Sequence, residues 1–141
     1  MAKVIGLDLG TKTMGIAISD SLGMIAYGYE NYRFEPGNYK AARAHLMRII
    51  DQEHVQEIAL GLPLHMSGDM SERATSCLRF KEDILAERPQ LKVVMVDERM
   101  TTMIAQKRMI EANVRKDKRR EVIDKMAAVV ILETYLAQWK A

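Results

Sequence analysis

Apolar residues gather in short runs in the first quarter of the chain. They fill 4–9 and 15–19, and polar and apolar residues alternate over 24–33. Runs of this length, bounded by glycine and turn residues, are typical of β-strands. Because only short turns separate the three segments, we expect them to form an antiparallel meander.

Helical periodicity begins after the break at 36–38. Ala42, Leu46 and Ile50 recur at intervals of four within 39–53, and side chains at this spacing share one face of a helix. The segment therefore predicts an amphipathic helix that packs against the strands.

Strands and helices alternate in the rest of the chain. The apolar runs 57–62 and 91–96 predict two buried strands. A helix between them is predicted to begin at Asp69, because Glu72 follows at the spacing of a capping box, and to end near residue 87. Its apolar positions, expected to be buried, are Ala74, Cys77, Leu78, Ile84 and Leu85. Further helices are predicted at 101–112 and 121–139.

This order of elements predicts an α/β fold. Strands separated by helices are usually parallel and joined by right-handed crossovers. We therefore expect a five-stranded mixed sheet, three antiparallel strands and then parallel ones, with helices on both faces. At 141 residues and 48% hydrophobic composition, the chain is expected to form a single domain, 1–141.

Asp8 is an unusual residue in a strand that is otherwise apolar on both faces. An ionised side chain without a partner is costly in such a place. Either Asp8 is held by hydrogen bonds in the turn 10–13, or it points out of the sheet toward a cation. The sequence leaves both interpretations open.

Acidic residues are expected to meet at one edge of the sheet. Asp8 and Glu98 lie at the carboxyl ends of two predicted parallel strands, where sites form in open α/β sheets. Asp124 falls on the otherwise apolar stripe of the last helix. Three carboxylates without histidine or cysteine suit Mg²⁺ or Mn²⁺, and two such ions can activate water against a phosphodiester.

Each of these carboxylates also has an ordinary structural explanation. Asp8 can cap its own turn, Glu98 can pair with Arg99, and Asp124 can pair with a neighbouring basic residue. Convergence of all three is harder to explain in this way than any one alone.

Basic charge is concentrated in the last third of the chain. Residues 1–98 hold 11 Lys and Arg against 14 Asp and Glu, whereas 99–141 hold 10 against 5. Such a basic face most often meets phosphates, although a solvated helix face is the simpler alternative. The candidate nucleic-acid-binding residues are Lys12, Arg73, Arg99, Arg115, Lys116, Lys118, Arg119 and Arg120.

Several other classes of protein are disfavoured by composition. Cys77 is the single cysteine and the three histidines lack metal-ligand spacing, which excludes a disulfide framework and a cysteine-rich zinc site. The N-terminus lacks the pattern of a signal peptide, and no apolar run is long enough to span a bilayer. A soluble, cytoplasmic protein without membrane partners is expected.

The chain contains four motifs in this order: GLDLGTKTMGIAISD, GLPLHMSG, VDERMTT and VIDKMAAVVILETYL. Through these motifs it resembles the YqgF family over essentially its whole length. The resemblance implies a ribonuclease-H-like nuclease domain that processes the 5′ end of precursor 16S rRNA with divalent metal ions. It places the family's acidic positions on Asp8, Glu98 and Asp124. It also implies precursor rRNA, and ribosomal particles, as partners.

The chain departs from the family pattern in one place, and the family itself departs from related resolvases in another. Many members have an arginine where this chain has Thr13, so a substrate contact there must come from Lys12 or from the basic C-terminal segment. The family lacks the fourth carboxylate that resolvases of this fold carry after the fourth strand, and in this chain that place is held by residues 61–63. Metal binding is then expected to be weaker, or to be completed by a substrate phosphate.

Two other functions stay open at this stage. A Holliday junction resolvase would act on branched DNA as a dimer, and no stretch of the sequence indicates an exposed apolar dimer face, so a monomer or weak homodimer is expected. A non-catalytic nucleic-acid-binding factor is the third possibility. The DLGT motif also resembles the phosphate loop of actin-like ATPases, but those need two such domains.

Overall fold

The computed structural model describes residues 2–64, 67, 70–98 and 119–139, the side chains of 119–124 excepted. The predicted helix at 101–112 lies outside these residues. So do four of the candidate phosphate-binding residues, Arg99, Arg115, Lys116 and Lys118.

Five strands form one mixed sheet in the order β3-β2-β1-β4-β5. The strands are β1 (Lys3–Leu9), β2 (Thr13–Ser19), β3 (Ala26–Arg33), β4 (Val55–Leu62) and β5 (Lys92–Asp97). Antiparallel pairing joins β1 to β2 and β2 to β3, whereas β4 pairs in parallel with both β1 and β5. The predicted meander with two parallel strands added to it is confirmed.

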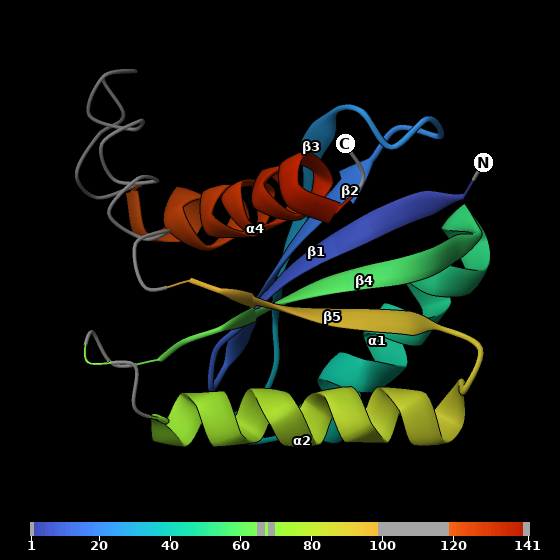
Figure 1. Cartoon of the computed structure of the whole chain (residues 1–141). Helices are drawn as coiled ribbons and strands as arrows, with labels where there is room; N and C mark the ends of the chain where they lie inside the picture. The colour runs from blue at the N-terminus through green and yellow to red at the C-terminus, as the bar shows by residue number, and fades with distance from the viewer. Residues whose placement is uncertain (1, 65–66, 68–69, 99–118, 140–141) are drawn as a thin grey trace.

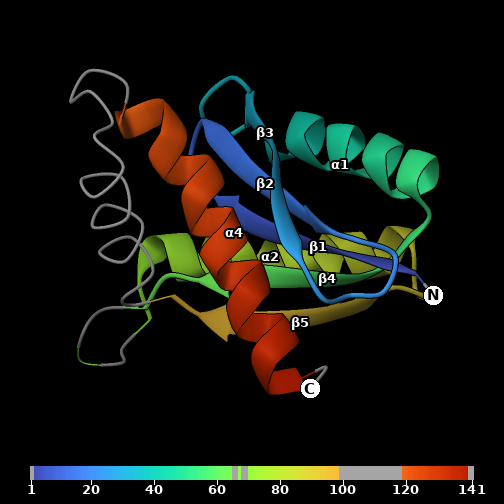
Figure 2. The same ribbon diagram turned by 90° about the horizontal axis from the view of Figure 1, so that it is seen from above.

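Helices cover both faces of the sheet (Figure 1). One face carries α1 (Tyr39–Glu53) and α2 (Glu72–Glu87), and the other carries α4 (Arg119–Trp139). Seen from above, α4 crosses the strands diagonally over the sheet (Figure 2). None of the helices in the described part of the chain combines the length and the apolar character that a bilayer crossing requires.

Successive side chains of β1 point to opposite faces of the sheet, and the hydrophobic interior is divided into one cluster on each face. Ile5, Leu7 and Leu9 belong to the cluster under α1 and α2, whereas Val4 belongs to the cluster under α4. Asp8, four residues after Val4, is therefore on the α4 side of the sheet.

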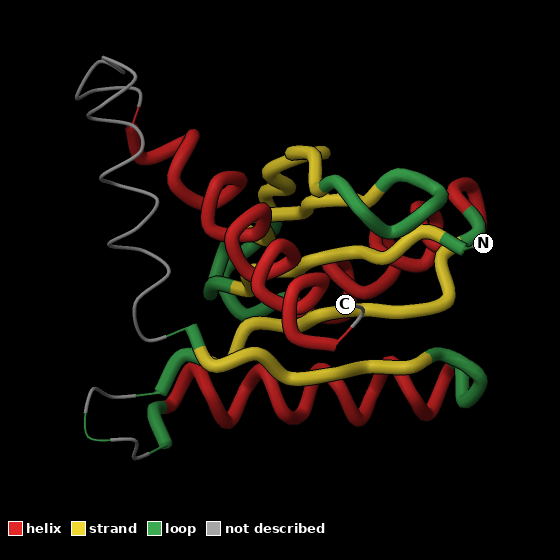
Figure 3. The backbone as a smooth tube through the Cα atoms, turned by 45° about the horizontal axis from the view of Figure 1, so that its top comes forward, coloured by secondary structure: helices red, strands yellow, loops and turns green. Residues whose placement is uncertain are grey.

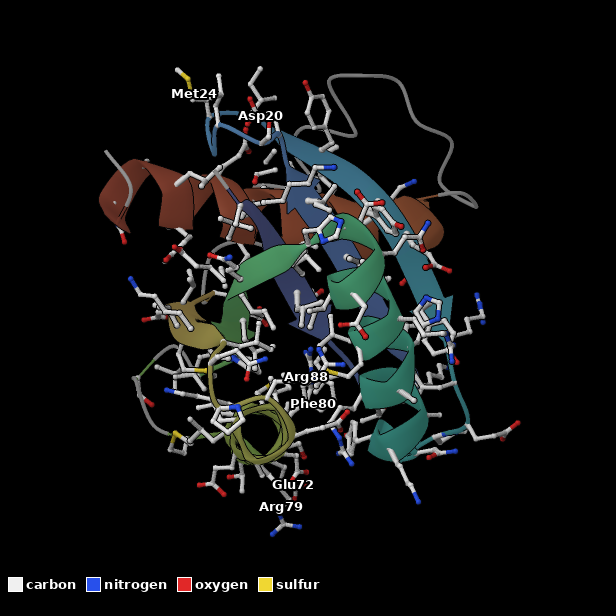
Figure 4. The ribbon with its side chains drawn as sticks, turned by 90° about the vertical axis from the view of Figure 1, so that its right-hand side faces the viewer. Asp20, Met24, Glu72, Arg79, Phe80 and Arg88 are labelled. Atoms are coloured by element: carbon white, nitrogen blue, oxygen red, sulfur yellow. The ribbon has the colours of Figure 1, made fainter. Side chains whose placement is uncertain are left out.

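The predicted buried faces of the helices are largely confirmed. In α1, the buried residues include all three that define its periodicity. In α2, Ala74, Cys77 and Ile84 are buried as expected, but Phe80 is buried where Leu78 and Leu85 were expected. Figure 4 shows Phe80 on the side of α2 that faces the sheet.

The predicted start of α2 at Asp69 is wrong. The helix begins at Glu72, and Ser71 is its N-cap, because the Ser71 hydroxyl accepts a hydrogen bond of 2.9 Å from the Ala74 N–H. The same hydroxyl donates to the carbonyl of Pro63, just after β4. Ser71 thus fastens the start of α2 to the end of the neighbouring strand, which the capping-box pattern does not reveal.

Gly6 allows α4 to lie directly on β1. A Cβ atom at this position would lie 2.7 Å from the Ala128 carbonyl oxygen and 2.7 Å from the Leu132 Cβ. Real Cβ atoms do not approach other atoms so closely, so the glycine sets the distance between helix and sheet.

Replacing Gly6 with alanine is expected to lower the free energy of unfolding by about 3 kcal/mol, because the new methyl group meets helix backbone that must shift as a unit. Urea denaturation measures the loss. Gly28→Ala is the matched control, since its Cβ would meet only the flexible Lys125 side chain, at 3.0 Å. Equal losses in the two variants would contradict the assigned role of Gly6.

Candidate active site

The carboxyl ends of β1, β4 and β5 lie at one edge of the sheet, and α4 begins at the same edge (Figures 1 and 3). Asp8 is the penultimate residue of β1, and Glu98 follows β5 directly. The Glu98 N–H donates to the Leu62 carbonyl at 3.2 Å, which holds the residue beside the end of β4. The predicted convergence of Asp8 and Glu98 is therefore confirmed.

Asp8 reaches this edge from the central strand. Its backbone pairs with Gly15 of β2, and its side chain is 13% exposed. The turn that follows is closed by a backbone hydrogen bond of 2.8 Å from the Gly10 N–H to the Thr13 carbonyl. Asp8 thus lies at the rim of the interior, where a cation from solvent can reach it.

The Glu98 carboxylate lies in space that Gly61 leaves open. A Cβ at position 61 would lie 1.9 Å from Glu98 Oε2 and 2.6 Å from the Ile131 Cδ1. Glu98 is only 8% exposed, so its carboxylate is packed against Gly61 of β4, on the side of the sheet where Ile131 of α4 lies. Gly61 belongs to the segment 61–63, where related resolvases are expected to carry a carboxylate, and it makes room for the carboxylate of Glu98.

Asp8 and Glu98 form a strongly interacting acidic pair. Burial raises the pKa of Glu98 to about 8, and the neighbouring Asp8 charge adds to the rise. A side-chain hydrogen bond to Asp8 acts in the same direction, because the protonated Glu98 carboxyl donates to the Asp8 carboxylate. Without a further cation, the two carboxyl groups of Asp8 and Glu98 together hold one proton near neutral pH.

Arg73 brings a positive charge to this pair from α2. Its guanidinium Nη2 lies 3.6 Å from Asp8 Oδ1 and donates a hydrogen bond of 2.9 Å to the Leu9 carbonyl. Its charge lowers the pKa of Glu98, against the effects of burial and of Asp8. The sequence predicts Arg73 as a phosphate contact, and the structure places it against a catalytic candidate.

Cys77 lies one turn after Arg73 and is buried beneath the site. Burial raises the pKa of its thiol to about 12, and the charges of Glu98 and Asp8 contribute in the same direction. A thiol with this pKa carries almost no thiolate at neutral pH, so Cys77 is a packing residue and not a nucleophile.

Basic side chains flank the site at the end of the meander. Lys12 is exposed in the turn after β1, and its carbonyl accepts a hydrogen bond of 2.9 Å from the Phe34 N–H. Thr13 pairs across the sheet with Arg33, an exposed residue at the end of β3. An arginine therefore lies beside position 13 although the chain has threonine there. Arg33 could not be identified from the sequence, because its place beside Thr13 depends on the register between β2 and β3.

Asp124 lies within α4, but its side chain is outside the described part of the chain, as are those of Arg119 and Arg120. The Asp124 backbone is one turn before Ala127 and Ala128, which are buried against the sheet. Its predicted role as a third acidic ligand stays a prediction.

The described part of the site is suited to a divalent cation but does not complete a ligand set. Among the described residues, no group of three His, Cys, Asp or Glu side chains is placed to hold a metal ion. The pair of Asp8 and Glu98 supplies the carboxylate oxygens that Mg²⁺ and Mn²⁺ prefer. Gly61 leaves room for the Glu98 carboxylate, so these two residues can supply two of the oxygen ligands of such an ion.

The sequence matches a protein family over residues 2–138, and the description of that family is "RuvX: Holliday junction resolvase". This chain belongs to the RuvX (YqgF) family. Relatives from Staphylococcus saprophyticus and Staphylococcus carnosus, each named "Putative pre-16S rRNA nuclease", are 42% identical over 134 residues. These alignments cover 95% of this chain and 94% of each relative. Membership confirms the resemblance and the prediction of a nuclease of the hydrolase class.

Solved structures with the same fold include resolvases. RuvC from Thermus thermophilus, in complex with a Holliday junction substrate, is similar with a TM-score of 0.59 at 12% identity, over 98% of both chains. The Fowlpox virus resolvase with its junction DNA gives 0.58 at 12% identity, over 96% of this chain and 97% of that one. At this level of identity the similarity establishes the ribonuclease-H-like fold of the RuvX chain and nothing finer.

Proposed function

We propose that the chain is a divalent-metal-dependent endonuclease that hydrolyses phosphodiester bonds in precursor 16S rRNA during 5′-end processing. The observation that carries the proposal is the pair of Asp8 and Glu98, brought together beside Arg73 at the carboxyl edge of the sheet. Two carboxylates held together against their own repulsion are costly for the fold, and such an arrangement is typical of functional sites.

The metal site is assigned to Asp8 and Glu98, with Asp124 as the proposed third ligand. Divalent ions bound there would activate the attacking water and stabilise the leaving oxygen of the phosphodiester. The burial of Glu98 fixes its carboxylate in one place, whereas Asp8 lies at the more open rim. The protein therefore presents one rigid and one accessible oxygen ligand toward the solvent.

A nucleic-acid backbone can follow the basic residues on either side of this pair. Lys12 and Arg33 lie on the meander side, and Arg73 lies at the start of α2. Arg119 and Arg120 are the first two residues of α4, and we place them on the path of the substrate. Phosphate contacts of this kind make binding weaken steeply as salt concentration rises.

Precursor rRNA is the substrate favoured by the relatives, whose name refers to pre-16S rRNA. Ribosomal precursor particles are the corresponding partner. Branched DNA is the second candidate, because the family description and the structural neighbours refer to Holliday junctions.

The described residues do include an exposed apolar group, contrary to the sequence-based expectation. It lies at the hairpin between β2 and β3 and comprises Leu22, Met24, Ile25 and Tyr27. Met24 and Ile25 were expected in a strand but precede β3, and Figure 4 shows Met24 at the tip of this hairpin. The hairpin lies near the start of β1, far from Asp8, so it does not support two active sites that act together on one junction.

Cleavage assays test the proposal with a 5′ fragment of precursor 16S rRNA and, separately, a four-way DNA junction. Each is incubated with Mg²⁺ or Mn²⁺, and with a chelator. We expect metal-dependent cleavage of the RNA, and loss of cleavage in Asp8→Asn because one anionic metal ligand is removed.

Asp20→Asn is the matched control, since it makes the same substitution at the distant hairpin, where Asp20 Oδ1 accepts from the Met24 N–H at 2.7 Å. Failure to cut either substrate, or equal cleavage by Asp8→Asn and the wild type, would refute the nuclease assignment. Cleavage of the junction alone would establish the resolvase alternative.

A further inference from the structure

Arg73 carries its positive charge at a position where such a charge does not stabilise α2. It is the second residue of α2 after the N-cap Ser71, and the N-terminus of a helix carries the positive end of its dipole. Acidic residues are preferred there, and Glu72 follows this preference. The stability of α2 therefore does not explain a positive charge at position 73.

Contacts of Arg73 instead link it to the active-site edge. Its guanidinium donates to the Leu9 carbonyl at 2.9 Å and lies 3.6 Å from Asp8 Oδ1. The Arg73 side chain is 47% exposed, whereas that of Asp8 is 13% exposed. The guanidinium therefore lies beside Asp8, and about half of the Arg73 side chain stays open to water.

We propose that Arg73 is an internal counter-cation of the Asp8–Glu98 pair, which a divalent metal ion must displace when it binds. The inference rests on the proposed function and specifies how that site is regulated. Arg73 holds the two carboxylates together in the metal-free protein and keeps metal affinity low. Substrate then restores the affinity by drawing the guanidinium away.

Coulomb repulsion supplies the reason for displacement. A divalent ion bound by Asp8 would lie within a few ångströms of the guanidinium, and like charges at that distance repel strongly in a partly buried site. Arg73 can leave because nearly half of its surface is already in solvent, at the loss of one hydrogen bond to Leu9.

A substrate phosphate offers the displaced guanidinium a better partner. Arginine binds phosphate oxygens through two parallel hydrogen bonds, which is a stronger contact than the one to the Leu9 carbonyl. The start of α2 adds backbone N–H groups that also favour an anion. Metal and phosphate should therefore bind cooperatively, because both favour the displaced position of the Arg73 guanidinium.

Isothermal titration of the metal-free, full-length protein with Mn²⁺ tests the inference without measuring cleavage. We expect Arg73→Gln to bind Mn²⁺ about tenfold more tightly than the wild type, because one repelling charge is gone. Arg79→Gln is the matched control, with the same change in charge on the same helix. Figure 4 shows Arg79 on the side of α2 that faces away from the sheet, and its affinity is expected to match the wild type.

Two further measurements separate this role from a merely structural one. Inorganic phosphate should increase the Mn²⁺ affinity of the wild type but not that of Arg73→Gln. Arg73→Lys, which keeps the charge, should retain the low wild-type affinity. Circular dichroism establishes that each variant is folded before titration.

Equal Mn²⁺ affinity in the wild type and Arg73→Gln would overturn the inference, as would an equal increase in Arg79→Gln. Absence of Mn²⁺ binding in both the wild type and Arg73→Gln would also overturn it. Tighter Mn²⁺ binding by Arg73→Gln, in a protein that cuts neither nucleic acid, would support the role of Arg73 while refuting the proposed nuclease function. Failure of the inference about Arg73 is thus distinguishable from failure of the proposed nuclease function.

Discussion

Replacing Glu98 with glutamine is expected to abolish cleavage and, at the same time, to stabilise the metal-free protein at alkaline pH. Loss of one anionic ligand should lower the cleavage rate by on the order of 10³-fold. The glutamine amide can still donate a hydrogen bond to Asp8, as the protonated carboxyl does. The substitution therefore removes the charge while keeping the shape and the contact.

The stability effect follows from the pKa of Glu98, which rises in the folded protein from an ordinary value of 4.5 to about 8. A folded pKa above the unfolded one means that the folded state binds the proton more tightly. The contribution of protonated Glu98 to the free energy of unfolding is therefore fully present below about pH 4.5 and is lost as pH rises toward 8. The change across this window is on the order of 3 kcal/mol, with the coupling to Asp8 limiting it.

Urea denaturation in the presence of chelator, at about pH 5 and about pH 8.5, measures this prediction. The wild type should lose stability between the two values, and Glu98→Gln should not. Asp20 and Asp51, whose pKa values are lowered by hydrogen bonds to backbone N–H groups and to Arg88 respectively, change protonation below this window. Adding Mg²⁺ at the higher pH should restore the wild type alone. A wild type with equal stability at both values would contradict the assigned burial of this charge.

Convergence of Asp8 and Glu98 could be predicted because it depends on topology alone. Parallel strands place their carboxyl ends at one edge of a sheet, so a carboxylate at each end must come near the other. The strand boundaries did not need to be accurate for this inference. β4, for example, begins at Val55 where the apolar run predicts residue 57, and the edge is unchanged.

Contacts that depend on local geometry could not be predicted in the same way. Arg33 lies beside Thr13 through a strand pairing that contains a register shift next to Ile16, and a shift of this kind changes which residues are neighbours. The start of α2 is predicted at Asp69, but Ser71 is an equally good type of N-cap residue. Choosing between them requires the contact of Ser71 with Pro63, which joins residues from different elements.

For Arg73 and Gly61, the sequence shows which residue is present, but only the structure shows what that residue contacts. The sequence indicates a basic residue near a helix start, but not that its guanidinium passes the end of β1 to reach Asp8. It also shows that residues 61–63 include no carboxylate, although related resolvases are expected to carry one there. Only the structure reveals that the missing side chain makes room for Glu98.

Replacing Gly61 with alanine is the second substitution with a large expected effect. The added Cβ would lie 1.9 Å from Glu98 Oε2 and 2.6 Å from the Ile131 Cδ1, so both side chains must move. Displacing a catalytic group by about 1 Å can lower a rate by about 10²-fold, and we expect a loss of this size in cleavage. Overpacking should also lower the free energy of unfolding by about 2 kcal/mol.

A second substitution separates these two effects. Ile131→Val removes the Cδ1 atom that the new methyl group would meet, but leaves Glu98 unchanged. In the Gly61→Ala background it should therefore recover part of the lost stability without recovering cleavage, whereas alone it should cost about 1 kcal/mol. If the double variant regained cleavage together with stability, the loss in Gly61→Ala would come from general packing, and the absence of a side chain at Gly61 would not be what positions the Glu98 carboxylate.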